Sequence, residues 1–128
     1  AKVFILGGVN DISHDLTPDS LCTSMEKLIV KIKQGSPRTK IYLQSLLPID
    51  NSFGRYRKMV GKEQVIVETN RLYKEMAERH GVTWIDLYSK MVDPVTGSMR
   101  KGLTNDGLHL LGAGYLVWRD AVLPYVKK

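Results

Sequence analysis

Two short polar motifs carry residue types that are used in hydrolytic chemistry. Residues 8–11 read Gly-Val-Asn-Asp and end an apolar run, and residues 106–109 read Asp-Gly-Leu-His near the C-terminus. The amide of Asn10 could donate to the oxygen that becomes negative when an acyl group is attacked. Asp106 could fix the tautomer of His109, so that the imidazole activates a hydroxyl nucleophile. The pair of motifs therefore predicts acyl-transfer chemistry.

Each motif taken alone has a simpler explanation. Gly8, Asn10 and Asp11 are residue types that favour turns for backbone reasons. Asp106 and His109 could be a capping residue and a chance surface neighbour. The functional interpretation depends on both motifs occurring in this order, each on the element where a site would need it.

Three apolar runs are predicted to form buried strands at residues 3–6, 41–47 and 83–88. They are continuous rather than alternating, which is typical of parallel strands that are covered on both faces. Because helical patterns separate them, the fold class is α/β with right-handed crossovers. Ligands bind at the carboxyl ends of such strands, and Asn10 and Asp11 directly follow the first one.

Three helices are predicted around this sheet. The first begins with Thr17 as its cap and Pro18 in its first turn, and the second runs over about residues 61–80, with Gly81 as its stop. The last begins near Gly112, and Pro124 is expected to disturb its final turn. The residues expected to face inward on this last helix are Ala113, Leu116, Val117 and Ala121. Residues 89–111 are predicted to be a long polar loop outside the core.

Composition is that of an ordinary globular chain. The 128 residues are 43% hydrophobic and 25% charged, which fits a single domain, and the apolar runs are too short to span a membrane. No secretory signal is visible, so the compartment stays open. The single cysteine, Cys22, excludes an intramolecular disulfide.

The net charge of +6 raises the alternative of a nucleic-acid-binding domain. Basic residues are spread along the chain, with one modest concentration at Arg55, Arg57, Lys58 and Lys62, so no nucleic-acid partner is expected. That segment is interpreted as a solvated loop, with contact to an anionic substrate as the alternative. No third ligand accompanies Asp106 and His109, so neither a metal nor a cofactor is expected.

With these motifs in place, the chain resembles the SGNH, or GDSL-type, hydrolase superfamily, closest to its acetylesterase and platelet-activating-factor acetylhydrolase-like members. The resemblance covers the Gly-x-Asn-Asp block, Leu-Leu-Pro at residues 46–48 and Asp-Gly-Leu-His-Leu at residues 106–110. It also covers Gly-x-Gly-Tyr-x-x-Trp at residues 112–118. It implies a flavodoxin-like three-layer α/β/α fold. It also implies that Asn10 donates to the oxyanion, supported by Gly8 and Asp11, and that Asp106 and His109 serve a serine.

The chain departs from that family at the nucleophile. The Gly-Asp-Ser block and a further oxyanion glycine, which members carry before Gly-x-Asn-Asp, are not found in the sequence. Ser13, Ser36, Ser45 and Ser98 lack the strand-to-turn context of an exposed nucleophile. We therefore expect residues 1–128 to be the C-terminal part of a hydrolase domain whose serine and N-terminal strands lie upstream.

The resemblance implies hydrolysis of short acyl esters, such as acetyl esters of a carbohydrate or a small lipid. The family strand order would leave the strand at residues 3–6 at an edge, where it needs a partner. That partner could be the missing N-terminal portion or a second copy of the chain. The alternative function is a truncated, non-catalytic module that binds other proteins through this edge.

Overall fold

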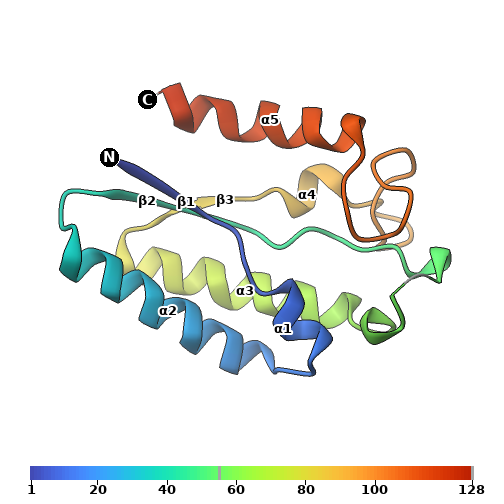
Figure 1. Ribbon diagram of the computed structural model, residues 1–128, viewed down its shortest axis with the longest axis horizontal. Coiled ribbons are helices and arrows are strands. Elements are labelled where there is room, and N and C mark those ends of the chain that lie inside the picture. Colours follow the sequence, from blue (N-terminus) through green and yellow to red (C-terminus); the bar gives the residue numbers. More distant parts are fainter. Residues whose placement is uncertain (55, 128) are drawn as a thin grey trace.

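The computed structural model describes residues 1–54 and 56–127, apart from the side chain of Asn10. A parallel sheet of order β1-β2-β3 forms its middle layer. The strands are β1 (Lys2–Ile5), β2 (Lys40–Gln44) and β3 (Thr83–Ile85). Helices α1 (Val9–Ser13), α2 (Pro18–Gly35) and α3 (Glu63–His80) lie on one side of the sheet, and α5 (Gly112–Lys127) lies on the other (Figure 1). The predicted three-layer α/β/α architecture is confirmed.

Alternate residues of β2 supply both faces of the sheet. Ile41 and Leu43 belong to the main core cluster with α2 and α3, whereas Tyr42 belongs to the cluster beneath α5. Tyr42 also stacks on Phe4 of β1, with ring centroids 4.6 Å apart. Burial on both faces explains why the strands read as continuous apolar runs.

The predicted ends of the first two long helices are confirmed. Thr17 caps α2, because its hydroxyl accepts a hydrogen bond from Ser20 N at 3.2 Å, and Pro18 is the first residue of the helix. α3 ends at Gly81, which adopts a left-handed conformation with φ 65°. The two helices pack against each other and bury Leu21, Met25, Ile29, Ile66, Tyr73, Met76 and Ala77.

The segment between the third strand and α5 is more ordered than predicted. β3 ends at Ile85, and Tyr88, predicted to be the last strand residue, instead begins the short helix α4 (Tyr88–Met91). Three side chains of this region form a buried cluster of their own, and they are Met91, Met99 and Leu103. Two antiparallel bridges, Val92↔Met99 and Thr104↔Leu110, pair backbone groups there, which lets a polar-looking segment contribute to the core.

Helix α5 presents a different face to the sheet than predicted. Ala121 is buried and Val117 packs partly buried against a core cluster, as expected, but Ala113 and Leu116 are exposed, and Gly114 and Val122 are buried instead. Gly114 permits this orientation because a Cβ there would lie 2.8 Å from the carbonyl oxygen of Leu103. The expected disturbance at Pro124 is also wrong, since α5 continues to Lys127. No helix in the described ranges is both long and apolar enough to cross a membrane.

Buried polar groups join the sheet to its surroundings. The Ser45 hydroxyl oxygen accepts hydrogen bonds from Leu87 N at 2.9 Å and Tyr88 N at 2.8 Å. Trp118 on α5 donates from Nε1 to the buried Gln44 Oε1 at 2.8 Å. Ser45 and Gln44 therefore hold the chain where β2 leaves the sheet, so Ser45 has a structural role.

Candidate active site

Asp106 and His109 are in direct contact, as their spacing predicts. His109 Nδ1 lies 2.8 Å from Asp106 Oδ2, so the neutral imidazole carries its proton on Nδ1 and leaves Nε2 for a nucleophile. The Asp106 side chain is only 15% exposed, whereas that of His109 is 68% exposed. A sheltered carboxylate thus orients an accessible imidazole.

The Asp106 carboxylate accepts several hydrogen bonds from its own loop. Its Oδ1 accepts from His109 N and Leu108 N, both at 2.8 Å, and from the Thr104 hydroxyl at 3.2 Å. These backbone donors, followed by the His109 side chain, hold the pKa of Asp106 well below its usual range. Asp106 is therefore ionised across the pH range in which histidine titrates.

Gly107 fits this loop against the segment that follows β2. Its φ is +91°, and a Cβ there would lie 2.0 Å from the carbonyl oxygen of Asp50. Asp50 N in turn donates to the Gly107 carbonyl oxygen at 2.8 Å. Both the left-handed backbone and the lack of space require glycine at this position.

We expect Gly107→Ala to destabilise the protein more than Gly102→Ala does. Gly102 has a similar φ of +88° but nothing within 4 Å of a Cβ, so it isolates the cost of the backbone conformation. The clash with Asp50 should add about 1–3 kcal/mol to the loss at position 107. Urea unfolding of both variants measures the difference, and equal losses would contradict the close packing of the loop.

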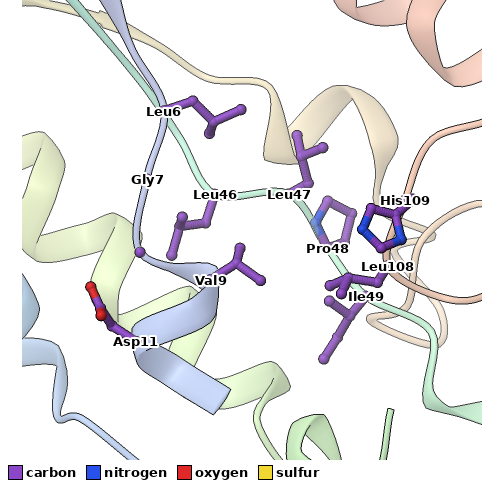
Figure 2. Close-up of a pocket in the computed structure, with 11 residues that line it drawn as sticks. Leu6, Gly7, Val9, Asp11, Leu46, Leu47, Pro48, Ile49, Leu108 and His109 are labelled. Carbon is purple, nitrogen blue, oxygen red and sulfur yellow. The ribbon is translucent and has the colours of Figure 1, made fainter. Parts of the chain in front are cut away.

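The Gly-Val-Asn-Asp motif begins a helix rather than a simple turn. Gly8 is the N-cap of α1 with φ +124°, and a Cβ there would lie 2.9 Å from the Tyr73 hydroxyl. Asp11 is exposed and points away from His109 in Figure 2. Asn10 belongs to α1, but its side chain lies outside the described part of the structure. Its role as an oxyanion donor therefore stays a prediction.

Two pockets meet at His109. The first, of about 520 Å³, is mainly apolar and lies between the chain leaving β1 and the chain leaving β2, with His109 at one end (Figure 2). It is lined by Leu6, Gly7, Gly8, Val9, Asp11, Leu46, Leu47, Pro48, Ile49, Leu108 and His109. The second, of about 470 Å³, includes Ser13, Tyr56, Arg57 and Lys58. Both lie beside the carboxyl ends of parallel strands, where α/β proteins bind ligands.

Tyr56 is a site residue that the sequence analysis missed. Its hydroxyl oxygen lies 3.2 Å from Asp106 Oδ2 and 3.1 Å from His109 Nδ1. Tyr56 lies between the short 3-10 helices η1 (Asn51–Phe53) and η2 (Arg57–Met59), in the basic segment that was interpreted as a solvated loop. No local pattern signals a contact between residues 50 positions apart.

The four serines considered as substitute nucleophiles have different surroundings. Ser45 is fully buried, Ser98 is partly buried, and Ser36 is the exposed C-cap of α2. Ser13, the last residue of α1, lines the second pocket together with His109. Within the described residues, no group of three or more histidine, cysteine, aspartate or glutamate side chains is placed to hold a metal ion.

An ionised aspartate that orients a histidine, beside a pocket at the carboxyl end of a parallel sheet, is the arrangement of an α/β hydrolase. The chain belongs to the GDSL-like lipase/acylhydrolase family, whose model matches residues 1–117. No curated protein matches the chain.

Solved structures share the fold over nearly the whole chain. A Streptococcus pneumonia protein, provisionally described as a platelet activating factor, is 30% identical, with a TM-score of 0.87 over 98% of this chain and 59% of its own. A GDSL-like lipase from Bacteroides thetaiotaomicron is 22% identical, with a TM-score of 0.87 over 99% and 62%. A variant of an acetyl-xylooligosaccharide esterase from Geobacillus Stearmophilus is 17% identical, with a TM-score of 0.72 over 98% and 58%. The chain thus spans about 60% of the length of these relatives.

Proposed function

We propose that this chain is part of a serine esterase that hydrolyses short acyl esters, such as acetyl esters of a carbohydrate or a small lipid. Family membership supports ester hydrolysis in general. The observation that carries the proposal is the 2.8 Å contact between His109 Nδ1 and Asp106 Oδ2 beside an apolar pocket. The acetyl and lipid candidates draw on relatives described as an acetyl-xylooligosaccharide esterase and as a platelet activating factor.

The proposed reaction assigns one step to each group. Nε2 of His109 takes the proton of a serine hydroxyl as the oxygen attacks the acyl carbonyl, and Asp106 stabilises the imidazolium that forms. Asn10 donates to the oxygen that becomes negative. His109 then returns the proton to the departing alcohol. A water molecule, activated in the same way, releases the acid and restores the serine.

We propose that the nucleophilic serine comes from a segment outside residues 1–128, with these residues forming the C-terminal part of the catalytic domain. The sequence contains no Gly-Asp-Ser block. Ser45 is sequestered by two backbone donors, and Ser13 is the last residue of a short helix rather than a residue in a strand-to-turn position. The relatives' greater length is consistent with further chain at the site.

We expect the 128-residue chain to hydrolyse p-nitrophenyl acetate no faster than its own His109→Ala variant, because the base has no serine to activate. Initial rates of the two proteins at equal concentration measure this. Hydrolysis well above the control, blocked by a phosphonate that labels a residue of this chain, would show that the serine lies within it. Ser13 would then be tested first.

A second candidate function is a non-catalytic module that binds through the edge of the sheet. In the described structure β1 pairs with β2 on one side only, and all four of its residues are partly exposed. An unpaired edge offers backbone groups to another strand. We propose that this edge pairs either with the upstream segment of a longer protein or with a second copy.

We expect the purified chain to associate, and Leu6→Lys to weaken that association more than Val60→Lys. Leu6 directly follows β1 and is 46% exposed, whereas Val60 is the C-cap of η2, outside the sheet, and is 62% exposed. Because both variants add one lysine at an exposed apolar residue, the comparison separates the effect of the position from the effect of the added charge. Sedimentation at micromolar concentration is the measurement, and a well-folded monomeric wild-type chain would contradict pairing of this edge with a second copy.

A further inference from the structure

Tyr56 lies where the two members of the proposed catalytic pair meet. Its hydroxyl oxygen is 3.2 Å from Asp106 Oδ2 and 3.1 Å from His109 Nδ1, and those two atoms are 2.8 Å apart. We infer that Tyr56 is a positioning residue of this pair, which holds Oδ2 towards His109 and takes up part of its negative charge. The inference rests on the proposed function, in which Asp106 orients His109 as the general base.

The direction of the hydrogen bonds follows from the charges. An ionised carboxylate can only accept, so the single hydroxyl proton of Tyr56 is directed to Oδ2 of Asp106. The other oxygen, Oδ1, is already surrounded by Leu108 N, His109 N and the Thr104 hydroxyl. Oδ2 is therefore shared between Tyr56 and His109, and each bond that it accepts from the tyrosine weakens its pull on the imidazolium.

Tyr56 can hold this position because its ring is anchored in the protein. The residue is partly buried and packs against the main core cluster. Its own carbonyl oxygen accepts a hydrogen bond from Met59 N at 3.0 Å. Asp50, earlier in the same segment, donates from its backbone N to the Gly107 carbonyl oxygen, so the chain after β2 contacts the loop of Asp106 and His109 at two places.

Other charged groups near His109 influence its imidazole equally in the wild-type protein and in a variant without the tyrosine hydroxyl. Arg57 and Lys58 line the second pocket, and Asp11 lines the first. Asp50 lies behind Gly107, where its carbonyl oxygen closely approaches the glycine. Removing only the hydroxyl of Tyr56 leaves all four of these described groups in place, so a change at His109 reports on the hydroxyl.

The test is a pH titration of the three histidines by NMR in the full 128-residue chain. We expect Tyr56→Phe to move the midpoint of the His109 titration to higher pH, since the carboxylate recovers the charge that the hydroxyl took up. His14 and His80 should not change. Tyr88→Phe, which removes a partly buried hydroxyl that lines a different pocket, should leave all three midpoints unchanged.

An unchanged midpoint in Tyr56→Phe would overturn the inference. A lowered midpoint would overturn it too, because it would mean that the tyrosine merely kept the loop closed and that His109 had lost its carboxylate. If Tyr56→Phe does not fold, 3-fluorotyrosine at position 56 provides the opposite change. Its more acidic hydroxyl is a stronger donor, so the His109 midpoint should fall.

Activity of a longer protein that carries the serine gives a separate readout. Tyr56→Phe should lower kcat several-fold with KM unchanged, and the acid limb of the kcat/KM profile should move to higher pH. A longer protein without esterase activity in any form would contradict the proposed function. The NMR midpoints would still decide the role of Tyr56.

Discussion

In a longer protein that carries the serine, Asp106→Asn is expected to lower kcat by about 10⁴-fold. The asparagine side chain keeps the shape of the aspartate but can present an N–H where His109 now donates. The imidazole would then be held in the wrong tautomer, and the imidazolium would lose its counter-charge. Because Oδ1 accepts two backbone hydrogen bonds at 2.8 Å, asparagine can place its own oxygen there and keep the loop.

The matched control is Asp120→Asn on the exposed side of α5. Asp120 pairs with Arg119 at 3.0 Å and has no contact with either pocket. The kcat of the Asp120→Asn variant should equal that of the wild type within error. If Asp106→Asn is folded and loses less than ten-fold in kcat, Asp106 does not orient the catalytic base.

Asn10→Ala is expected to lower kcat of the same protein by roughly 10²–10³-fold with little change in KM. An oxyanion donor interacts most strongly when the carbonyl oxygen becomes negative, so its loss affects the transition state more than substrate binding. The reason to expect this is the position of Asn10 in α1, just beyond the carboxyl end of β1.

Asn105→Ala is a suitable control for this change, because Asn105 is an exposed asparagine directly before Asp106. It tests whether removing any side-chain amide near Asp106 and His109 reduces the rate. An unchanged kcat in folded Asn10→Ala would leave residues 8–11 with only the structural task of beginning α1.

Much of the fold follows from local patterns in the sequence. The strands at Lys2–Ile5 and Lys40–Gln44 coincide with continuous apolar runs, because both faces of a central parallel sheet are buried. Thr17-Pro18 and Gly81 mark helix ends, because capping depends on a few neighbouring residues. The contact between Asp106 and His109 was also predictable, since one short turn of chain brings them together.

Features that depend on distant parts of the chain were not predictable. Tyr56 reaches His109 only because the segment after β2 packs against the loop that carries Asp106 and His109. The burial of Met91 and Met99 depends on the backbone bridges that fold residues 92–110 back on themselves, which no apolar periodicity indicated. The inward face of α5 was predicted wrongly because it depends on the close approach of the Leu103 carbonyl to Gly114. That approach is set by tertiary packing, and no local sequence pattern indicates it.

The most direct test of the account is labelling of the longer protein with a serine-directed fluorophosphonate, followed by mass spectrometry of the labelled peptide. We expect one labelled serine outside residues 1–128, with a labelling rate that falls sharply in His109→Ala, because the proposed mechanism makes His109 the base that activates it. A label on Ser13 or another serine of this chain, or an equal labelling rate in His109→Ala, would contradict it.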